Sequence, residues 1–102
     1  MSKWKGLAKG RIEFDENILL EDKIIFMIGR ILGIDTEEIT TEVQIHQLCD
    51  ELDLIEIVMS IELQFDMMIP DEDFTTFGTV GGLIKYVNKK KYRNRKIQNL
   101  ID

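Results

Sequence analysis

The longest apolar pattern in the chain lies between Leu48 and Asp66, in the sequence LCDELDLIEIVMSIELQFD. At about 100° per residue, a helix would spread its apolar side chains over most of its circumference and leave one narrow polar strip. That strip consists of Asp53, Glu56, Ser60 and Gln64. A helix of this kind needs neighbours on several sides, so we expect this stretch to be the central helix of a helical domain.

A first helix is expected between about Asn17 and Gly33, with Asn17 or an early acidic residue as its N-cap and Gly33 as its stop. This stretch also contains Ile25, Phe26 and Ile31, which give it a further apolar face to cover. We expect residues 1–16, an N-terminal extension, to cover this face, and a partner or a second copy is the alternative. The apolar residues of the extension are Trp4, Leu7, Ile12 and Phe14.

Residues 35–51 read as a long loop, anchored into the bundle by Val43, Ile45 and Leu48. After the central helix, Pro70 disfavours helix at the preceding residue. The acidic run 71–73 then suits the first turn of a short helix, because carboxylates interact favourably with the helix dipole.

The last helix is expected to begin near Val80, with Thr79 as its cap, and to run at least through Val87. Gly81 and Gly82 each cost roughly 1 kcal/mol relative to alanine in a helix interior, so this end should fray. Residues 89–102 form a basic C-terminal extension. It is either a frayed, solvated segment, a clamp on the acidic body or on a partner, or a weak attachment to an anionic surface.

The net charge of −6 conceals a strong asymmetry. Residues 18–84 carry fifteen acidic and two basic side chains, a balance of −13, whereas residues 85–102 carry seven basic and one acidic side chain, a balance of +6. An acidic body argues against nucleic-acid binding, which requires neutralised phosphates. It favours partners with basic patches, although acidity that serves only solubility remains an alternative.

Taken together, these segments resemble the acyl carrier proteins, small four-helix bundles that hold acyl chains on a phosphopantetheine arm. The central stretch matches the second helix of that family, which opens with Asp-Ser-Leu, where this chain has Asp50-Glu51-Leu52. The Ile-Pro-Asp-Glu junction at 69–72 and the spaced glycines within 27–34 match as well. By this resemblance, Ile25, Phe26 and Ile31 stand where the family usually has polar residues that face water. The resemblance implies an all-α four-helix bundle with a long first loop and a short third helix. It spans about residues 17–88, with extensions at 1–16 and 89–102.

By this resemblance, Glu51 stands where the family has its attachment serine. Transfer of the arm needs a hydroxyl that attacks a phosphoanhydride, whereas a carboxylate repels the diphosphate and would give a labile mixed anhydride. Cys49 and Ser60 are poor substitutes, one pointing elsewhere and the other more than two turns along the helix. We therefore expect no cofactor, unless Glu51 is an engineered replacement or another residue accepts phosphopantetheine.

The resemblance also implies a docking face and an acyl pocket. By this resemblance, partner enzymes, including those of acyl-chain synthesis, would bind the acidic face of the central helix through their own basic patches. That face comprises Asp50, Asp53, Glu56, Met59, Ser60, Glu62 and Leu63, although Met59 and Leu63 could equally be core. The candidate pocket walls are Ile57, Ile61, Phe65, Met68, Ile69, Phe74, Phe77 and Ile84.

No catalytic or metal-binding constellation is visible in the sequence. His46 has no ligand partner at metal-binding spacing and reads as a loop residue, and the glycines fit neither phosphate-binding fingerprint. A single cysteine fits a reducing compartment such as the cytoplasm, and there is no apolar run typical of a signal peptide or a membrane span. Two readings remain open: a degenerate carrier that acts by docking on other proteins, and a genuine acyl carrier. The oligomeric state is open too.

Overall fold

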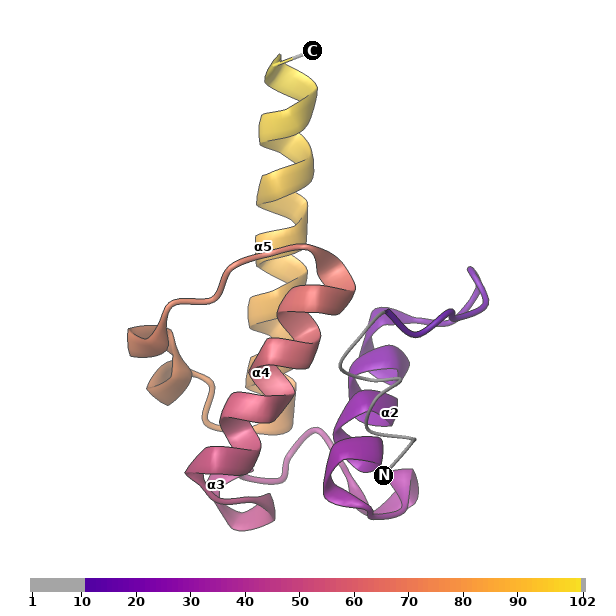
Figure 1. The fold of residues 1–102 in the computed structure, drawn as a ribbon, viewed down its shortest axis with the longest axis vertical. Coiled ribbons are helices and arrows are strands. Elements are labelled where there is room, and N and C mark those ends of the chain that lie inside the picture. Colours follow the sequence, from indigo (N-terminus) through magenta and orange to yellow (C-terminus); the bar gives the residue numbers. More distant parts are fainter. Residues whose placement is uncertain (1–10, 102) are drawn as a thin grey trace.

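The computed structural model describes the backbone of residues 11–101 and the side chains of residues 11–92. Three long helices, α2, α4 and α5, make up the body, and three short helical turns lie in the connections (Figure 1). In chain order the elements are α2 Leu20–Leu32, η1 Thr36–Glu38, α3 Ile45–Leu48, α4 Glu51–Phe65, η2 Asp71–Thr76 and α5 Val80–Ile101. The described part has no strand, only an isolated bridge between Gln44 and Thr79. The predicted all-α fold is confirmed, with its short third helix as the 3₁₀ turn η2.

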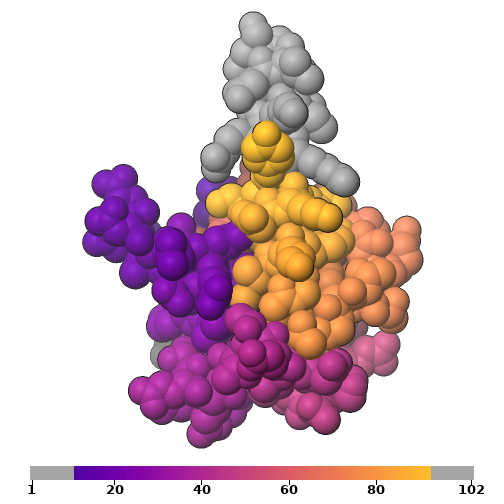
Figure 2. All heavy atoms as spheres, turned by 180° about the vertical axis from the view of Figure 1, so that it is seen from behind, coloured from indigo at the N-terminus to yellow at the C-terminus, as the bar shows by residue number. Residues whose placement is uncertain are grey.

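One apolar cluster joins the three long helices. α2 packs on both α4 and α5, and the view from behind shows the α5 side chains between α2 and the segment around η2 (Figure 2). Burial of each of these side chains stabilises the fold by about 1.5–3 kcal/mol. The members with almost no exposed surface are Ile24, Ile28, Val58, Ile61, Val80, Leu83 and Val87.

The central helix differs from the prediction in its start and in its burial. It begins at Glu51 rather than Leu48, because Asp50 is extended and its carboxylate caps the helix by accepting the Asp53 N–H at 2.9 Å. Its apolar residues are not all covered, since Leu52 is 75% exposed and Met59 62% exposed. The expectation of burial on several sides was therefore wrong for the face that carries Leu52, Met59 and Leu63.

The predicted stop of the first helix is confirmed, but its predicted cap is not. Gly33 adopts the left-handed conformation, with φ 72°, and its N–H bonds the carbonyl oxygen of Gly29. The N-cap is Leu19, which makes no side-chain capping bond, whereas the Asn17 N–H binds the Asp15 carboxylate in the preceding turn.

The described residues of the N-terminal extension contact the apolar face of α2 at Phe26, which stays 38% exposed, so the predicted covering of this face is only partial. The ring of Phe14 meets the ring of Phe26 edge-on, with 5.7 Å between centroids. The Gln64 side-chain amide makes two hydrogen bonds to the backbone of Ile12. It donates to the carbonyl oxygen at 2.9 Å and accepts from the N–H at 2.8 Å. Arg11 Nε also donates to the carbonyl oxygen of Leu63 at 3.0 Å. Trp4 and Leu7 lie outside the described residues.

The start of α5 is held by close backbone contacts rather than frayed. The predicted cap is confirmed, since Thr79 Oγ1 accepts the Gly82 N–H at 3.0 Å. The Gly81 N–H bonds the carbonyl oxygen of Thr41 at 2.8 Å, and a Cβ on Gly82 would overlap the carbonyl oxygen of Phe77. α5 then continues past Asn88 to Ile101 and projects beyond the bundle, so the backbone of the extension is helical (Figure 1).

Candidate functional site

Glu51 is the first residue of α4 and is exposed to solvent. The short helix α3 and the extended residues Cys49 and Asp50 lead the chain into this position. Three carboxylates, from Asp50, Glu51 and Asp53, gather at this end of the helix. The partial positive charge of a helix N-terminus stabilises such a group, and Asp50 also serves as the cap.

A pocket of about 350 Å³ opens beside Glu51, between α3, the first turn of α4 and η2. Ile45, Leu54 and Phe74 give it an apolar lining, and Asp50 and Glu51 lie at its edge. The full set of lining residues is Ile45, His46, Cys49, Asp50, Glu51, Leu54, Phe74, Thr75 and Gly78. The site is therefore an apolar pocket with an acidic rim.

Cys49 lies half-buried in the wall of this pocket. Its Sγ donates to the carbonyl oxygen of Ile45 at 3.7 Å. Burial raises the pKa of the Cys49 thiol, and the negative charges of Asp53 and Asp50 raise it further. The thiolate, which is the nucleophilic form, is therefore disfavoured here.

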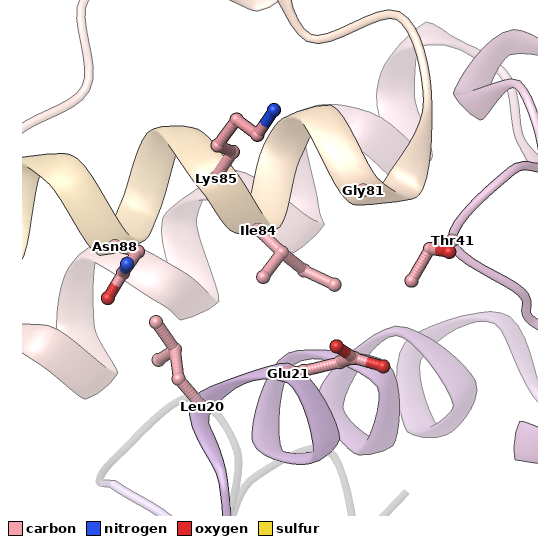
Figure 3. Close-up of a pocket in the computed structure, with 7 residues that line it drawn as sticks. All are labelled: Leu20, Glu21, Thr41, Gly81, Ile84, Lys85 and Asn88. Atoms are coloured by element: carbon pink, nitrogen blue, oxygen red, sulfur yellow. The ribbon is translucent and has the colours of Figure 1, made fainter.

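The pocket walls named from the sequence do not all meet at this pocket. Only Phe74 lines it, while Ile57, Ile61, Ile69 and Phe77 are buried in the core and Phe65 is half-buried. Met68 is 78% exposed. Ile84 lines a different pocket of about 330 Å³ between α2 and α5, where it faces Leu20 with Thr41 at one end (Figure 3).

Sequence reasoning named only Phe74 as a wall of this pocket and missed six other lining residues, which are Ile45, His46, Cys49, Leu54, Thr75 and Gly78. His46 was expected in a loop, but it lies in α3 and lines the pocket beside Glu51. Leu54 follows Glu51 by three positions and could have been found from helical spacing. Thr75 and Gly78 come from a separate connection, and no local pattern indicates that they reach this pocket.

The predicted docking residues lie along the outer side of α4. Asp50, Glu56, Met59 and Leu63 are exposed, whereas Asp53, Ser60 and Glu62 are half-buried. The ambiguity over Met59 and Leu63 is thereby decided in favour of the surface. Glu62 already has a structural role, since its carboxylate accepts the Ile69 N–H at 2.8 Å. The outer face of α4 therefore combines exposed apolar side chains with carboxylates.

Known proteins share the part of the chain that builds this site. The protein-family profile described as "Phosphopantetheine attachment site" matches residues 22–87, well over half of the chain. The acyl carrier protein of Syntrophobacter fumaroxidans is 39% identical over 74 residues, which cover 71% of this chain and 91% of that protein. The chain belongs to the acyl carrier protein family. The resemblance found in the sequence is confirmed.

Acyl carrier proteins are carrier domains that interact with enzymes of acyl-chain synthesis, and they are not themselves catalysts. The prosthetic group of the family is phosphopantetheine. Among the described residues, no group of three or more His, Cys, Asp or Glu side chains is placed to hold a metal ion. No helix in the described part combines the length and hydropathy that a bilayer span requires.

Proposed function

We propose that this acyl carrier protein homologue acts by docking on partner proteins through α4 and is not loaded with phosphopantetheine at position 51. The observation that carries the proposal is the identity of the first residue of α4. Glu51 stands there, exposed, in the Asp-Glu-Leu sequence that matches the Asp-Ser-Leu of the family. A carboxylate offers no hydroxyl for a phosphodiester bond and repels the diphosphate of coenzyme A.

The residues around Glu51 do not fit the prosthetic group any better. Ser60 lies nine positions further along α4, about 13 Å along the helix axis at about 1.5 Å per residue. Thr75 is exposed but belongs to η2, not to the tip of a long helix. The raised pKa of Cys49 keeps its thiol protonated.

The outer face of α4 supports the docking half of the proposal. Exposed Leu52, Met59 and Leu63 lie on one side of the helix, and Glu56 is exposed among them. An apolar centre with a charged rim is the usual composition of a protein interface. The acidic charge would steer partners that carry basic patches, such as enzymes of acyl-chain synthesis.

The alternative function is that of a genuine acyl carrier in fatty acid, polyketide or related synthesis. Family membership and the close match to a curated acyl carrier protein favour it. It requires that Glu51 replace a natural serine or that another residue accept the arm. A phosphopantetheine arm on the unaltered chain would select this alternative.

A competition experiment tests the docking half. The Glu51→Ser variant should become a substrate of a promiscuous phosphopantetheinyl transferase, because the rest of the docking face is unchanged. The unaltered chain should then inhibit loading of Glu51→Ser competitively, raising the apparent KM without changing kcat, since it occupies the transferase but accepts no arm.

Two variants of the inhibitor make the competition specific. Glu56→Lys reverses a charge on the docking face and should inhibit several-fold less strongly than the unaltered chain. Glu42→Lys makes the same change at an exposed position in the loop before α3, and it should inhibit as well as the unaltered chain. Absence of inhibition at a large excess of the unaltered chain would reject docking through α4.

A further inference from the structure

The pocket beside Glu51 is suited to an apolar group that arrives with positive charge. Its volume of about 350 Å³ is more than twice that of a cavity of about 150 Å³ that binds benzene, so it can take a large apolar side chain. Asp50 and Glu51 are exposed at its edge, and Asp53 lies within the same helical turn. These carboxylates repel an anionic ligand and attract a cationic one.

The chain itself carries a segment with this chemistry. Residues 89–96 read KKKYRNRK and contain six basic residues, and the last turn of α5 contains Ile97, Leu100 and Ile101. Lys90 and Lys91 lie over the rings of Tyr86 and Phe65, so the part of α5 that projects beyond the bundle begins after them (Figure 1). Its sequence still contains Arg93, Arg95 and Lys96. The molecule therefore has an acidic pole with an apolar pocket and a basic pole with an apolar tip.

The basic pole cannot reach the pocket of its own molecule. Gly78 in the pocket wall lies two residues before α5 begins, and Ile101 ends the same helix. At about 1.5 Å per residue, the helix separates its two ends by about 30 Å. Figure 1 accordingly shows α3 and the C-terminal end of α5 at opposite ends of the molecule. Only a second copy can bring the two poles together while α5 stays one helix.

We propose that residues 93–101 of a second copy dock on this pocket, with an apolar residue of the last turn of α5 inside it and Arg93, Arg95 and Lys96 on the side of the acidic rim. The contact joins two different surfaces, so it is head-to-tail and can extend into open chains. It should be sensitive to salt, because the charges of its rim lie near water. It rests on the proposed function in one respect, that Glu51 carries no arm that would block the pocket.

Sedimentation velocity of the full chain over a range of protein concentrations tests the proposal. At about 0.01 M ionic strength, where the Debye length is about 30 Å, the average mass should rise with concentration. At about 1 M, where it is about 3 Å, the chain should sediment as a monomer. A chain that stays monomeric at low salt up to the highest attainable concentration would overturn the proposal.

Complementation between two variants locates the contact. Thr75→Trp, at an exposed position on the pocket wall, fills the pocket and keeps the tail, whereas Arg93→Glu/Lys96→Glu reverses the tail and keeps the pocket. Each variant alone should be monomeric at low salt. Their mixture should form a 1:1 dimer that does not grow, because only one productive contact remains. Continued self-association of either variant alone would overturn the proposal.

A second pair of variants, with smaller changes, keeps the test valid if Thr75→Trp does not fold. Glu51→Gln removes one rim charge and should weaken self-association about two- to fivefold, as expected for one exposed ion pair. Glu42→Gln makes the same change outside the pocket wall and should leave self-association unchanged. Equal effects of the two would count against the pocket as the contact. The intact mass of the chain after exposure to a transferase tests the proposed function separately, so either claim can fail alone.

Discussion

At the scale of single residues, Gly82 shows how a tertiary contact reverses a local preference. Helix propensity alone predicts that alanine would stabilise the start of α5 by up to about 1 kcal/mol. The carbonyl oxygen of Phe77 occupies the place of a Cβ on Gly82, so we expect Gly82→Ala to lower the free energy of unfolding by about 1–3 kcal/mol. Urea denaturation measures the change.

Gly81→Ala and Asn88→Ala are the matched controls for that substitution. A Cβ on Gly81 would meet the carbonyl oxygen of Thr41 at 3.0 Å, so Gly81→Ala should cost less than Gly82→Ala. Asn88 is exposed on the same helix, and its replacement by alanine should be neutral or slightly stabilising. A Gly82→Ala chain as stable as the unaltered protein would show that the Phe77 contact is not tight.

Residue-scale prediction succeeded where the chemistry was local. Gly33 ends the first helix because glycine readily adopts the left-handed conformation. Thr79 caps the last helix because its hydroxyl accepts the N–H of the residue three positions later, Gly82. The cap at Asn17 failed because the Asp15 carboxylate binds the Asn17 N–H in a turn that precedes the helix. Nothing in the spacing distinguishes these two uses of a short polar side chain.

At the scale of elements, residues 11–16 form a strap that contacts two helices. Phe14 meets Phe26 of α2, and the backbone of Ile12 bonds Gln64 of α4. Truncation before Asn17 should increase the exposure of Phe26, which is already 38% exposed, and remove the bonds from Ile12 to Gln64. We expect this chain to lose stability or to self-associate, as seen by urea denaturation and light scattering. A chain that begins at Arg11 is the matched control, since it retains the described contacts of the strap.

The Gln64→Ala variant tests the same strap without truncation. It removes two hydrogen bonds to Ile12, each of which contributes about 0.5–1.5 kcal/mol, so we expect a loss of about 1–3 kcal/mol. If the chain beginning at Asn17 proved as stable and as monomeric as the chain beginning at Arg11, the strap would have no structural role.

The identity and order of the long helices could be predicted from apolar periodicity, whereas the exposure of α4 could not. From the sequence, Leu52 and Met59 look like core residues because they are apolar, although both are exposed. The sequence does not show which side of a helix the other helices cover. α2 packs on α4, but the side of α4 that carries Leu52 and Met59 stays apolar and exposed. An apolar surface of this kind is expected where a partner binds.

At the scale of the whole molecule, the site at Glu51 stays a prediction from the sequence, which gave no sign of the pocket beside that residue. The identity of that residue follows from the match to Asp-Ser-Leu, which is a local pattern. The pocket brings together Ile45, Leu54 and Phe74 from three separate elements. Such a meeting depends on how the connections fold over the start of α4, and one sequence carries no direct signal for it.

The charge asymmetry is likewise a property of the whole molecule. The sequence places acidic residues in the body and basic residues in the tail. The structure adds that α5 carries the basic residues away from the acidic end in one continuous helix (Figure 1). Because the opposite charges lie at different ends, they can attract those of another molecule. A basic tail that folded back would instead neutralise the acidic body of its own molecule.

The intact mass of the protein after incubation with coenzyme A and a promiscuous phosphopantetheinyl transferase tests the central claim most directly. The unaltered chain should keep its mass, because no hydroxyl stands at the start of α4, while the Glu51→Ser variant should gain the mass of one arm. Such a gain on the unaltered chain, at any residue, would contradict the account and identify the protein as a working acyl carrier.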